Sequence, residues 1–179
     1  MFLSPADSRL DLPSMTHLRS YQAAIAEGYQ IEPAAPLLGN TPDSQALHLA
    51  WLNTQGDTLL LPDGRLVPRV PHRQLWLTHA YTFIGRVNIR FQLLPEMELW
   101  GGNIGYAIRP SMQRRGFGTH ILRLAIIEAR AGGLGRLLLT CSDDNIGSIK
   151  VIEANGGMLR DIIPHPRQPG ALARRYWID

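Results

Sequence analysis

A short stretch of the chain combines residue types that bind phosphate with a spacing that presents them at the start of a helix. In residues 110–133, PSMQRRGFGTHILRLAIIEARAGG, Arg114 and Arg115 precede Gly116 and Gly118. The first turn of a helix carries unpaired backbone N–H groups and partial positive charge, so it favours an anion. Glycines let a phosphate approach the backbone closely, and guanidinium groups bind its oxygens. The stretch predicts a diphosphate-binding loop, although a glycine-rich turn between strand and helix would look similar.

The spacing excludes two common phosphate motifs. No G-x-x-x-x-G-K-[ST] pattern occurs, and the sole lysine, Lys150, lies elsewhere in the chain. A dinucleotide fingerprint would need a third glycine where Ile121 stands, and an acidic residue about 20 positions further on. The diphosphate therefore belongs to a different kind of ligand.

The elements that must position this loop are a strand before it and a long helix after it. Alternating apolar residues predict strands at 9–13, 74–80, 82–93 and 103–110, and a buried strand at 135–142. Helical spacing predicts a helix capped by Ser14 and a second one at 44–55 with Leu47, Ala50 and Trp51 on one side. It also predicts a helix of about 16 residues after the loop and one at 145–155. Strands at 157–163 and 173–179 follow, and prolines and glycines predict loops at 32–44 and 61–73. The order predicts a mixed α/β fold with a strand-helix-strand crossover.

Composition narrows the class of protein. With 179 residues, 45% of them hydrophobic, the chain fits one compact domain. Cys141 is the single cysteine, so an internal disulfide and a cysteine-based metal cluster are excluded. The net charge of +3 is mild and comes almost wholly from arginine, whereas a nucleic-acid binder would show a denser basic patch. No apolar run reaches the ~20 residues that would span a bilayer, and the first residues lack a secretory signal. We expect a cytoplasmic protein without membrane, nucleic acid or metal.

Two motifs together resemble one known superfamily. Gln113, Gly116 and Gly118 have the spacing of the acetyl-CoA loop of the GNAT (GCN5-related N-acetyltransferase) superfamily, and LLLTCSDDNIGSIKVIEANGG resembles the second half of its core. The segments GGNIGYAIRPSMQRRGFG and RRYWID are similar to a branch of predicted acetyltransferases within it. The resemblance is strong over residues 87–179 and weak over the first 70. It implies a single α/β (α+β) domain, 1–179, whose mixed, mostly antiparallel sheet is splayed in the middle and flanked by helices.

The resemblance also assigns cofactor contacts. It implies that acetyl-CoA is the co-substrate and that backbone groups of Ala107, Ile108 and Arg109 bond its pantetheine arm like an added strand. Asn145 and Ser148 would lie near the thioester, although an asparagine there also suits a helix cap. The pyrophosphate would rest on the loop formed by Gln113, Arg114, Arg115, Gly116, Phe117, Gly118 and Thr119.

The residues that would transfer protons are less clear. Many family members place a tyrosine acid on the last helix, but Ile152 stands at that position, so Ser148, Cys141 or solvent would have to serve. Glu96 and Glu98 are candidate bases, with solvated loop carboxylates as the alternative, and His72 and His79 are further candidates. The side chains of Tyr106 and Ile108 are expected in the core.

These observations predict an acyl-CoA-dependent N-acetyltransferase that moves an acetyl group by direct attack of a primary amine, on a small molecule or on a protein or peptide. A homodimer is possible, since dimers are common in the superfamily. A catalytically weak acyl-CoA-binding or sensing module is the main alternative. A basic nucleic-acid-binding domain is a more remote one.

Overall fold

The structure is a computed structural model that describes residues 3–30, 35, 38–54, 58–60 and 64–179. Its helices and strands follow the predicted order with three additions. The helices are α1 (Leu18–Ala26), α2 (Pro42–Thr54), α3 (Pro95–Leu99), α4 (Phe117–Ala131) and α5 (Ile146–Glu153), with 3-10 turns η1 (Pro5–Asp7), η2 (Met15–His17) and η3 (Pro110–Met112). The strands are β1 (Arg9–Asp11), β2 (Thr58–Leu60), β3 (Leu66–Pro68), β4 (His72–His79), β5 (Thr82–Arg90), β6 (Ile104–Ile108), β7 (Leu137–Ser142), β8 (Met158–Pro164) and β9 (Leu172–Ile178).

The additions are α3 and the β2–β3 pair. The loop predicted at 61–73 is in part the strand β3, which pairs antiparallel with β2, while its residues 61–63 and part of the predicted loop at 32–44 lie outside the described residues. The prolines around β3 argued against a strand in the sequence, because proline is tolerated only at edge positions of a sheet. The helix α3 begins at Pro95, a residue that suits the first turn of a helix because it lacks an N–H.

Within the described part of the chain, the two larger sheets have the orders β1-β4-β5-β6 and β7-β9-β8. The strand β9 pairs antiparallel with both of its neighbours, with Tyr176 opposite Leu139 on β7 and Leu159 on β8. β6 and β7 are each the end strand of a sheet. The fold is thus mixed α/β with antiparallel sheets flanked by helices, as predicted.

The chain forms two compact units, and β4, β5 and β6 contribute residues to both. The first unit comprises Met1–Arg69, Arg73–Arg86 and Ala107–Phe117, and the second comprises Val70–His72, Val87–Tyr106 and Gly118–Asp179.

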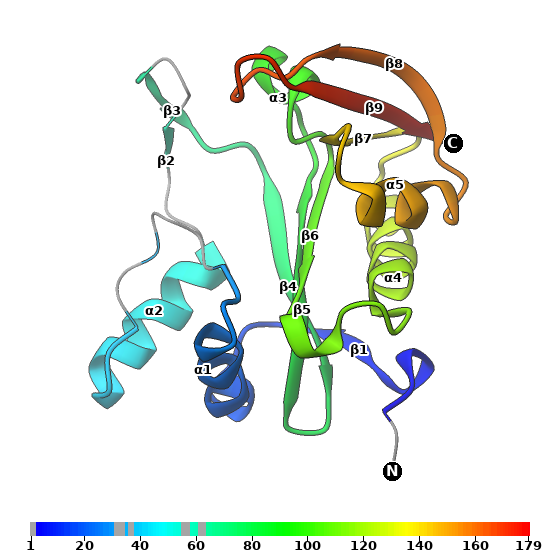
Figure 1. Cartoon of the computed structure of the whole chain (residues 1–179). Coiled ribbons are helices and arrows are strands. Elements are labelled where there is room, and N and C mark those ends of the chain that lie inside the picture. The colour runs from blue at the N-terminus through cyan, green and yellow to red at the C-terminus, as the bar shows by residue number, and fades with distance from the viewer. Residues whose placement is uncertain (1–2, 31–34, 36–37, 55–57, 61–63) are drawn as a thin grey trace. The chain divides into compact units, whose positions relative to one another are not determined.

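An aromatic cluster forms the core of the first unit, where α1 and α2 pack with residues of β4 and β5 (Figure 1). Tyr21 of α1 stacks on Trp76 with ring centroids 4.7 Å apart and also lies 5.7 Å from the ring of His48 on α2. The buried face of α2 therefore consists of His48, Leu49 and Leu52, whereas Leu47 is 60% exposed. Of the three residues predicted to share one side of α2, Leu47 and Ala50 are exposed, whereas Trp51 packs against the core. The ring of Tyr21 on α1 lies against His48, so the buried face includes a histidine.

The second unit contains α4 and β7, which are the helix and the second strand of the predicted crossover, together with α5. The helix α4 buries Ile121, Leu122, Ala125, Ile126 and Ala129, as its apolar pattern predicted. The two helices α4 and α5 lie together beside the β7-β9-β8 sheet (Figure 1), and Asn155 at the end of α5 donates to the carbonyl of Thr119 at 3.2 Å.

Asn103 lies immediately before β6 and links the start of that strand to β7 by hydrogen bonds. Its backbone N–H donates to the Leu138 carbonyl at 2.7 Å, and its side-chain oxygen accepts from the Leu138 N–H at 2.8 Å. Its side-chain amide also donates to the carbonyl of Arg90 at 3.1 Å. The residue before Asn103 has to be a glycine. A Cβ on Gly102 would lie 2.2 Å from the Leu138 carbonyl oxygen, and the φ of Gly102 is +57°. Apart from these hydrogen bonds at Asn103, no strand among the described residues pairs with the edge of β6 that faces away from β5.

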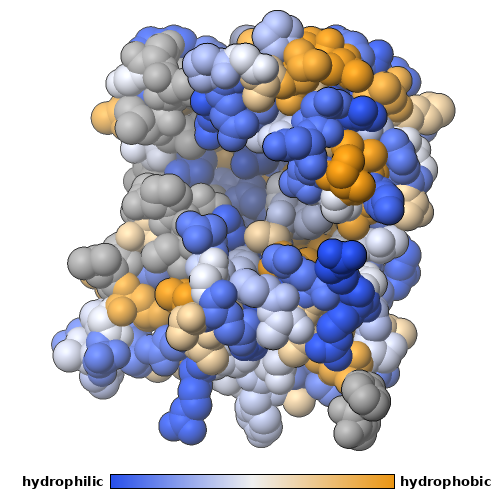
Figure 2. Space-filling view, viewed as in Figure 1, coloured by the Kyte–Doolittle hydropathy of each residue, from blue (hydrophilic) through white to orange (hydrophobic). Residues whose placement is uncertain are grey.

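Apolar side chains gather on the surface over β8 and β9 (Figure 2). Met158, Leu159, Ile162 and Leu172 are each more than 40% exposed. No helix among the described residues is long and apolar enough to cross a membrane.

Candidate active site

The predicted phosphate loop connects η3 to α4 and is exposed to solvent. Gln113, Arg114, Arg115 and Gly116 are exposed, whereas Phe117 is fully buried and anchors the start of the helix. Two residues have left-handed backbone, Arg114 at φ +59° and Gly116 at φ +85°. A left-handed arginine is uncommon, because its Cβ crowds the backbone there. The loop thus has an unusual, tightly turned backbone at the amino end of a helix of 15 residues.

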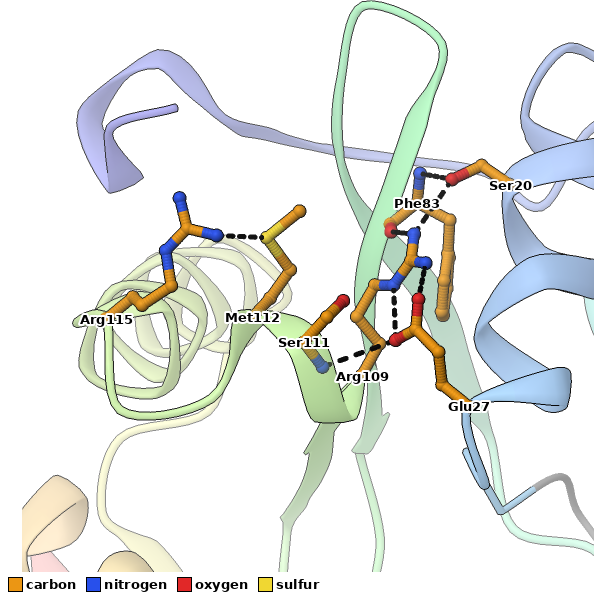
Figure 3. Close-up of polar contacts among 7 residues, drawn as sticks. All are labelled: Ser20, Glu27, Phe83, Arg109, Ser111, Met112 and Arg115. Atoms are coloured by element: carbon orange, nitrogen blue, oxygen red, sulfur yellow. Dashed lines mark hydrogen bonds and ion pairs between the residues drawn. The ribbon is translucent and has the colours of Figure 1, made fainter. Parts of the chain in front are cut away.

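The side chains around the loop hold its shape. The Gln113 amide donates to the carbonyl of Ile108 at 2.9 Å. The Arg115 guanidinium contacts the sulfur of Met112 at 3.0 Å (Figure 3) and lies 5.5 Å from the centre of the Phe117 ring. Arg115 is therefore held over the start of α4, where its charge adds to that of the helix dipole.

The strand β6 presents one edge to β5 and leaves the other without a strand partner in the described part of the chain. The N–H of Arg109 donates to the carbonyl of Ile84 at 2.9 Å, so Arg109 faces β5 with its backbone. Backbone groups of successive residues in a strand point to opposite edges. Ala107 therefore faces β5 as well, and Ile108 faces the other edge. Of the three residues predicted to bond the pantetheine, Ile108 has the backbone orientation that this role needs.

The buried side chain of Arg109 is held by a polar cluster that is itself only partly buried (Figure 3). Its guanidinium forms an ion pair with Glu27 at the end of α1 and donates to the Ser20 hydroxyl and the Phe83 carbonyl, each at 3.1 Å. Glu27 also accepts from the N–H of Ser111 at 3.2 Å. The hydrogen bond from Arg109 lowers the pKa of Glu27 to about 2. The cluster fixes the chain where it leaves β6, a role that the sequence did not reveal.

The second unit holds the residues predicted near the thioester. Asn145 caps α5, because its side-chain oxygen accepts from the N–H of Ser148 at 3.0 Å. The helix-cap reading is thus confirmed, and the predicted contact of Asn145 with the cofactor stays a prediction. Cys141 on β7 is buried, and burial raises the pKa of its thiol to about 11. Ile152 is 1% exposed and has no proton to donate.

The candidate bases lie on α3 and in β4. Glu96 and Glu98 belong to the helix α3 and not to a loop, and Glu98 is exposed. The Glu98 carbonyl accepts from the guanidinium of Arg175 at 3.1 Å, which in turn is paired with Asp161. His79 contacts the backbone carbonyl of Asp7 through Nδ1 at 2.9 Å. The proposed roles of these residues in proton transfer stay predictions.

Among the described residues, no group of three His, Cys, Asp or Glu side chains comes together as a metal site would require. The first unit thus carries a phosphate-type loop next to the end of β6, whose far edge has no strand partner among the described residues, and the second unit carries the buried thiol of Cys141.

Comparison with known proteins identifies the family. A model of the acetyltransferase (GNAT) domain family matches residues 2–158. No curated protein sequence matches the chain. Among solved structures, the microcin C7 self-immunity acetyltransferase MccE, in complex with acetyl-CoA and AMP, is 17% identical, with a TM-score of 0.60 and coverage of 96% of this chain and 92% of that one.

Two further structures have the same fold. RimL, a ribosomal alpha-N-protein acetyltransferase, is 14% identical with a TM-score of 0.62, covering 96% of this chain and 90% of its own. RimJ from Mycobacterium smegmatis, in complex with a CoA disulfide, is 16% identical with a TM-score of 0.64, covering 96% and 81%. The chain belongs to the GNAT acetyltransferase family and is an acyl-CoA-dependent N-acetyltransferase.

Proposed function

We propose that this enzyme transfers the acetyl group of acetyl-CoA directly to a primary amine, without an acetylated enzyme intermediate. The observation that carries the proposal is the state of Cys141. A cysteine attacks a thioester as the thiolate. Because burial raises the pKa of the Cys141 thiol to about 11, the thiolate is scarce near neutral pH. The amine itself is then the nucleophile.

The proposed cofactor site follows the chain from β6 into α4. The backbone of Gln113 to Thr119 holds the pyrophosphate, with Arg114 and Arg115 adding positive charge. Along β6, Ile108 offers its backbone N–H to the pantetheine arm, which takes the place of a neighbouring strand. Asn145 and Ser148 lie near the thioester in this proposal.

The acceptor is either a protein or peptide amine or a small-molecule amine. RimL is named for acetylating a protein amino terminus, and MccE for self-immunity to a microcin. A peptide with a free amino terminus is therefore the first acceptor to test, followed by polyamines and aminoglycosides. The predicted homodimer stays a prediction.

The experiment measures CoA release from acetyl-CoA across this amine panel, with mass spectrometry of the product. Direct transfer predicts intersecting initial-velocity lines when both substrates are varied. It also predicts that Cys141→Ala retains activity within a few-fold. Parallel lines together with an inactive Cys141→Ala would show an acetyl-cysteine intermediate instead. Tight CoA binding with no acceptor in the panel would favour the acyl-CoA-sensing module.

A further inference from the structure

A cavity of about 420 Å³ opens on the surface of the second unit. It lies between α4, the turn that follows α5, and the paired ends of β8 and β9, beside the mark C in Figure 1. None of the residues that line it has a part in the proposed acetyl transfer. Sites for small molecules have about this volume, and combine an apolar lining with a few polar groups that orient the ligand.

The apolar part of the lining comes from three elements. Ile126 of α4 and Ile178 of β9 are buried, whereas Ile127 of α4 and Met158 of β8 are 53% and 54% exposed. A ligand in the cavity would remove these two side chains from water, which favours its binding. A methionine side chain also adapts its shape to what it contacts. The lining therefore suits a ligand with a branched apolar group.

Arg123 gives the cavity a positive charge that no carboxylate neutralises among the described residues. Its guanidinium has one side-chain contact there, with Nδ1 of His120 at 3.2 Å. Arg123 precedes Ile127 by four positions, so both side chains lie on the same face of α4. A guanidinium binds a carboxylate through two parallel hydrogen bonds. The apolar lining thus has a site for a carboxylate next to it.

The one acidic residue of the lining does not supply this carboxylate. The Asp179 side chain is paired with Arg136 at 2.8 Å, and the backbone oxygen of Asp179 accepts from Arg130. Asp179 is therefore held by two other arginines.

Asn155 adds a hydrogen-bond acceptor to the lining. Its side-chain amide nitrogen donates to the carbonyls of Thr119 at 3.2 Å and Val151 at 2.8 Å, which uses both of its hydrogens. These two bonds fix the orientation of the amide. Its oxygen accepts from no residue that the structure describes. The oxygen can therefore accept an N–H from a ligand.

We propose that this cavity binds a small N-acylated apolar amino acid, at a site separate from that of acetyl-CoA. The carboxylate of the ligand pairs with Arg123, its apolar side chain covers Ile127 and Met158, and its amide N–H donates to the oxygen of Asn155. Such a ligand has no free amine, so it is not an acetyl acceptor. The proposal therefore does not depend on the proposed acetyl transfer.

The first experiment titrates the full chain with N-acetyl-L-leucine and three analogues by calorimetry. We expect N-acetyl-L-leucine to bind with a Kd of about 1 mM or tighter. The methyl ester lacks the carboxylate and N-acetylglycine lacks the apolar group, so each should bind about ten-fold more weakly. The N-methylated amide lacks the donor and should lose about three-fold or more. No binding of N-acetyl-L-leucine, or equal binding of the methyl ester, would overturn the proposal.

A second experiment tests the residues. Arg123→Gln should weaken N-acetyl-L-leucine about ten-fold and leave the affinity of the methyl ester unchanged, because only the acid uses the guanidinium. Arg167→Gln is the matched control, since it removes an exposed arginine of the same unit that does not line the cavity. Equal affinity of the acid for Arg123→Gln and the wild type would overturn the proposal.

A third experiment places the ligand by methyl NMR of isoleucine and methionine residues. N-acetyl-L-leucine should shift the methyl signals of Ile127 and Met158, and saturating CoA should leave its Kd within about two-fold. Shifts confined to other methyl groups would overturn the proposal. Displacement of the ligand by CoA would also overturn it, because the cavity would then belong to the cofactor site. The absence of acetyl transfer to every amine tested would contradict the proposed function and leave these three results unchanged.

Discussion

Gly118, in the first turn of α4, faces Val151 of α5 so closely that a Cβ on Gly118 would lie 3.1 Å from Val151 Cγ2. Few real Cβ contacts are so short. The glycine is predicted to let a phosphate approach the loop, but the packing of the two helices also leaves little room for a side chain at this position. A variant at Gly118 therefore changes the helix contact as well as the loop.

We expect Gly118→Val to destabilise the fold without any ligand present. Overpacking a well-filled contact costs about 1–3 kcal/mol, which lowers the Tm of a chain of this size by roughly 3–10 °C. The double variant Gly118→Val with Val151→Ala should recover most of the loss, because the second change removes the methyl groups in the way. Thermal unfolding of the three variants measures this. Additive losses in the double variant would contradict the close contact.

The arginines of the loop give a cleaner test of the phosphate site. CoA should stabilise the wild type by about 2.7 kcal/mol at a hundredfold excess over Kd. Arg114→Gln and Arg115→Gln should each reduce this thermal shift, because each removes a charge that attracts the phosphates while the backbone stays intact. Arg123→Gln, which removes a charge further along α4, serves as the control. A shift reduced equally by all three variants would show only a general effect of net charge.

The ion pair between Glu27 and Arg109 predicts a pH dependence of stability. The pKa of Glu27 is about 2 in the folded chain and 4.5 ordinarily, so the folded state gains stability above pH 4.5 and loses it as pH falls towards 2. Since Glu27 is partly exposed, we expect the loss between pH 5 and pH 3 to be roughly 1 kcal/mol. Urea unfolding of the wild type and Glu27→Gln tests this.

The loss should be absent in Glu27→Gln, which should also be less stable at pH 7 because Arg109 then stays buried without its partner. Asp144→Asn changes an exposed carboxylate and should keep the wild-type pH dependence. Identical pH dependence in the wild type and Glu27→Gln would contradict the lowered pKa.

Asn103 should be among the most sensitive positions outside the apolar core. Asn103→Ala leaves the Leu138 N–H and the Arg90 carbonyl without their side-chain partners. Each such group costs about 1–3 kcal/mol, so we expect the free energy of unfolding to fall by roughly 2–4 kcal/mol. Equal stability of Asn103→Ala and the wild type would show that water replaces both bonds.

The residues that the sequence could not predict are those joined across long separations. The loop before α4, the crossover and the cap at Asn145 follow from local spacing, since each depends on neighbours within one element. Glu27 and Arg109 are 82 positions apart, and no periodic pattern relates them. The inward face of α2 depended on the ring of Tyr21, and the junction at Asn103 on the backbone of Leu138. The cavity beside α4 is lined by residues of several elements, and no local pattern brings Arg123 and Met158 together.

The last prediction concerns the base that frees the amine. If Glu96 or Glu98 accepts the amine proton, directly or through water, the transfer rate should rise with pH through one ionisation, because the acceptor arrives mostly as an ammonium ion. The corresponding Gln variant should lose about 10²–10⁴ in rate and flatten that rise, while the thermal shift with CoA stays unchanged. Both residues lie on α3, so each Gln variant controls for any effect of the other on the helix. Full activity and an unchanged pH profile in both variants would remove the carboxylates as candidates. His72→Gln and His79→Gln would then be compared in the same assay, and four silent variants would leave attack by the small fraction of free amine as the mechanism.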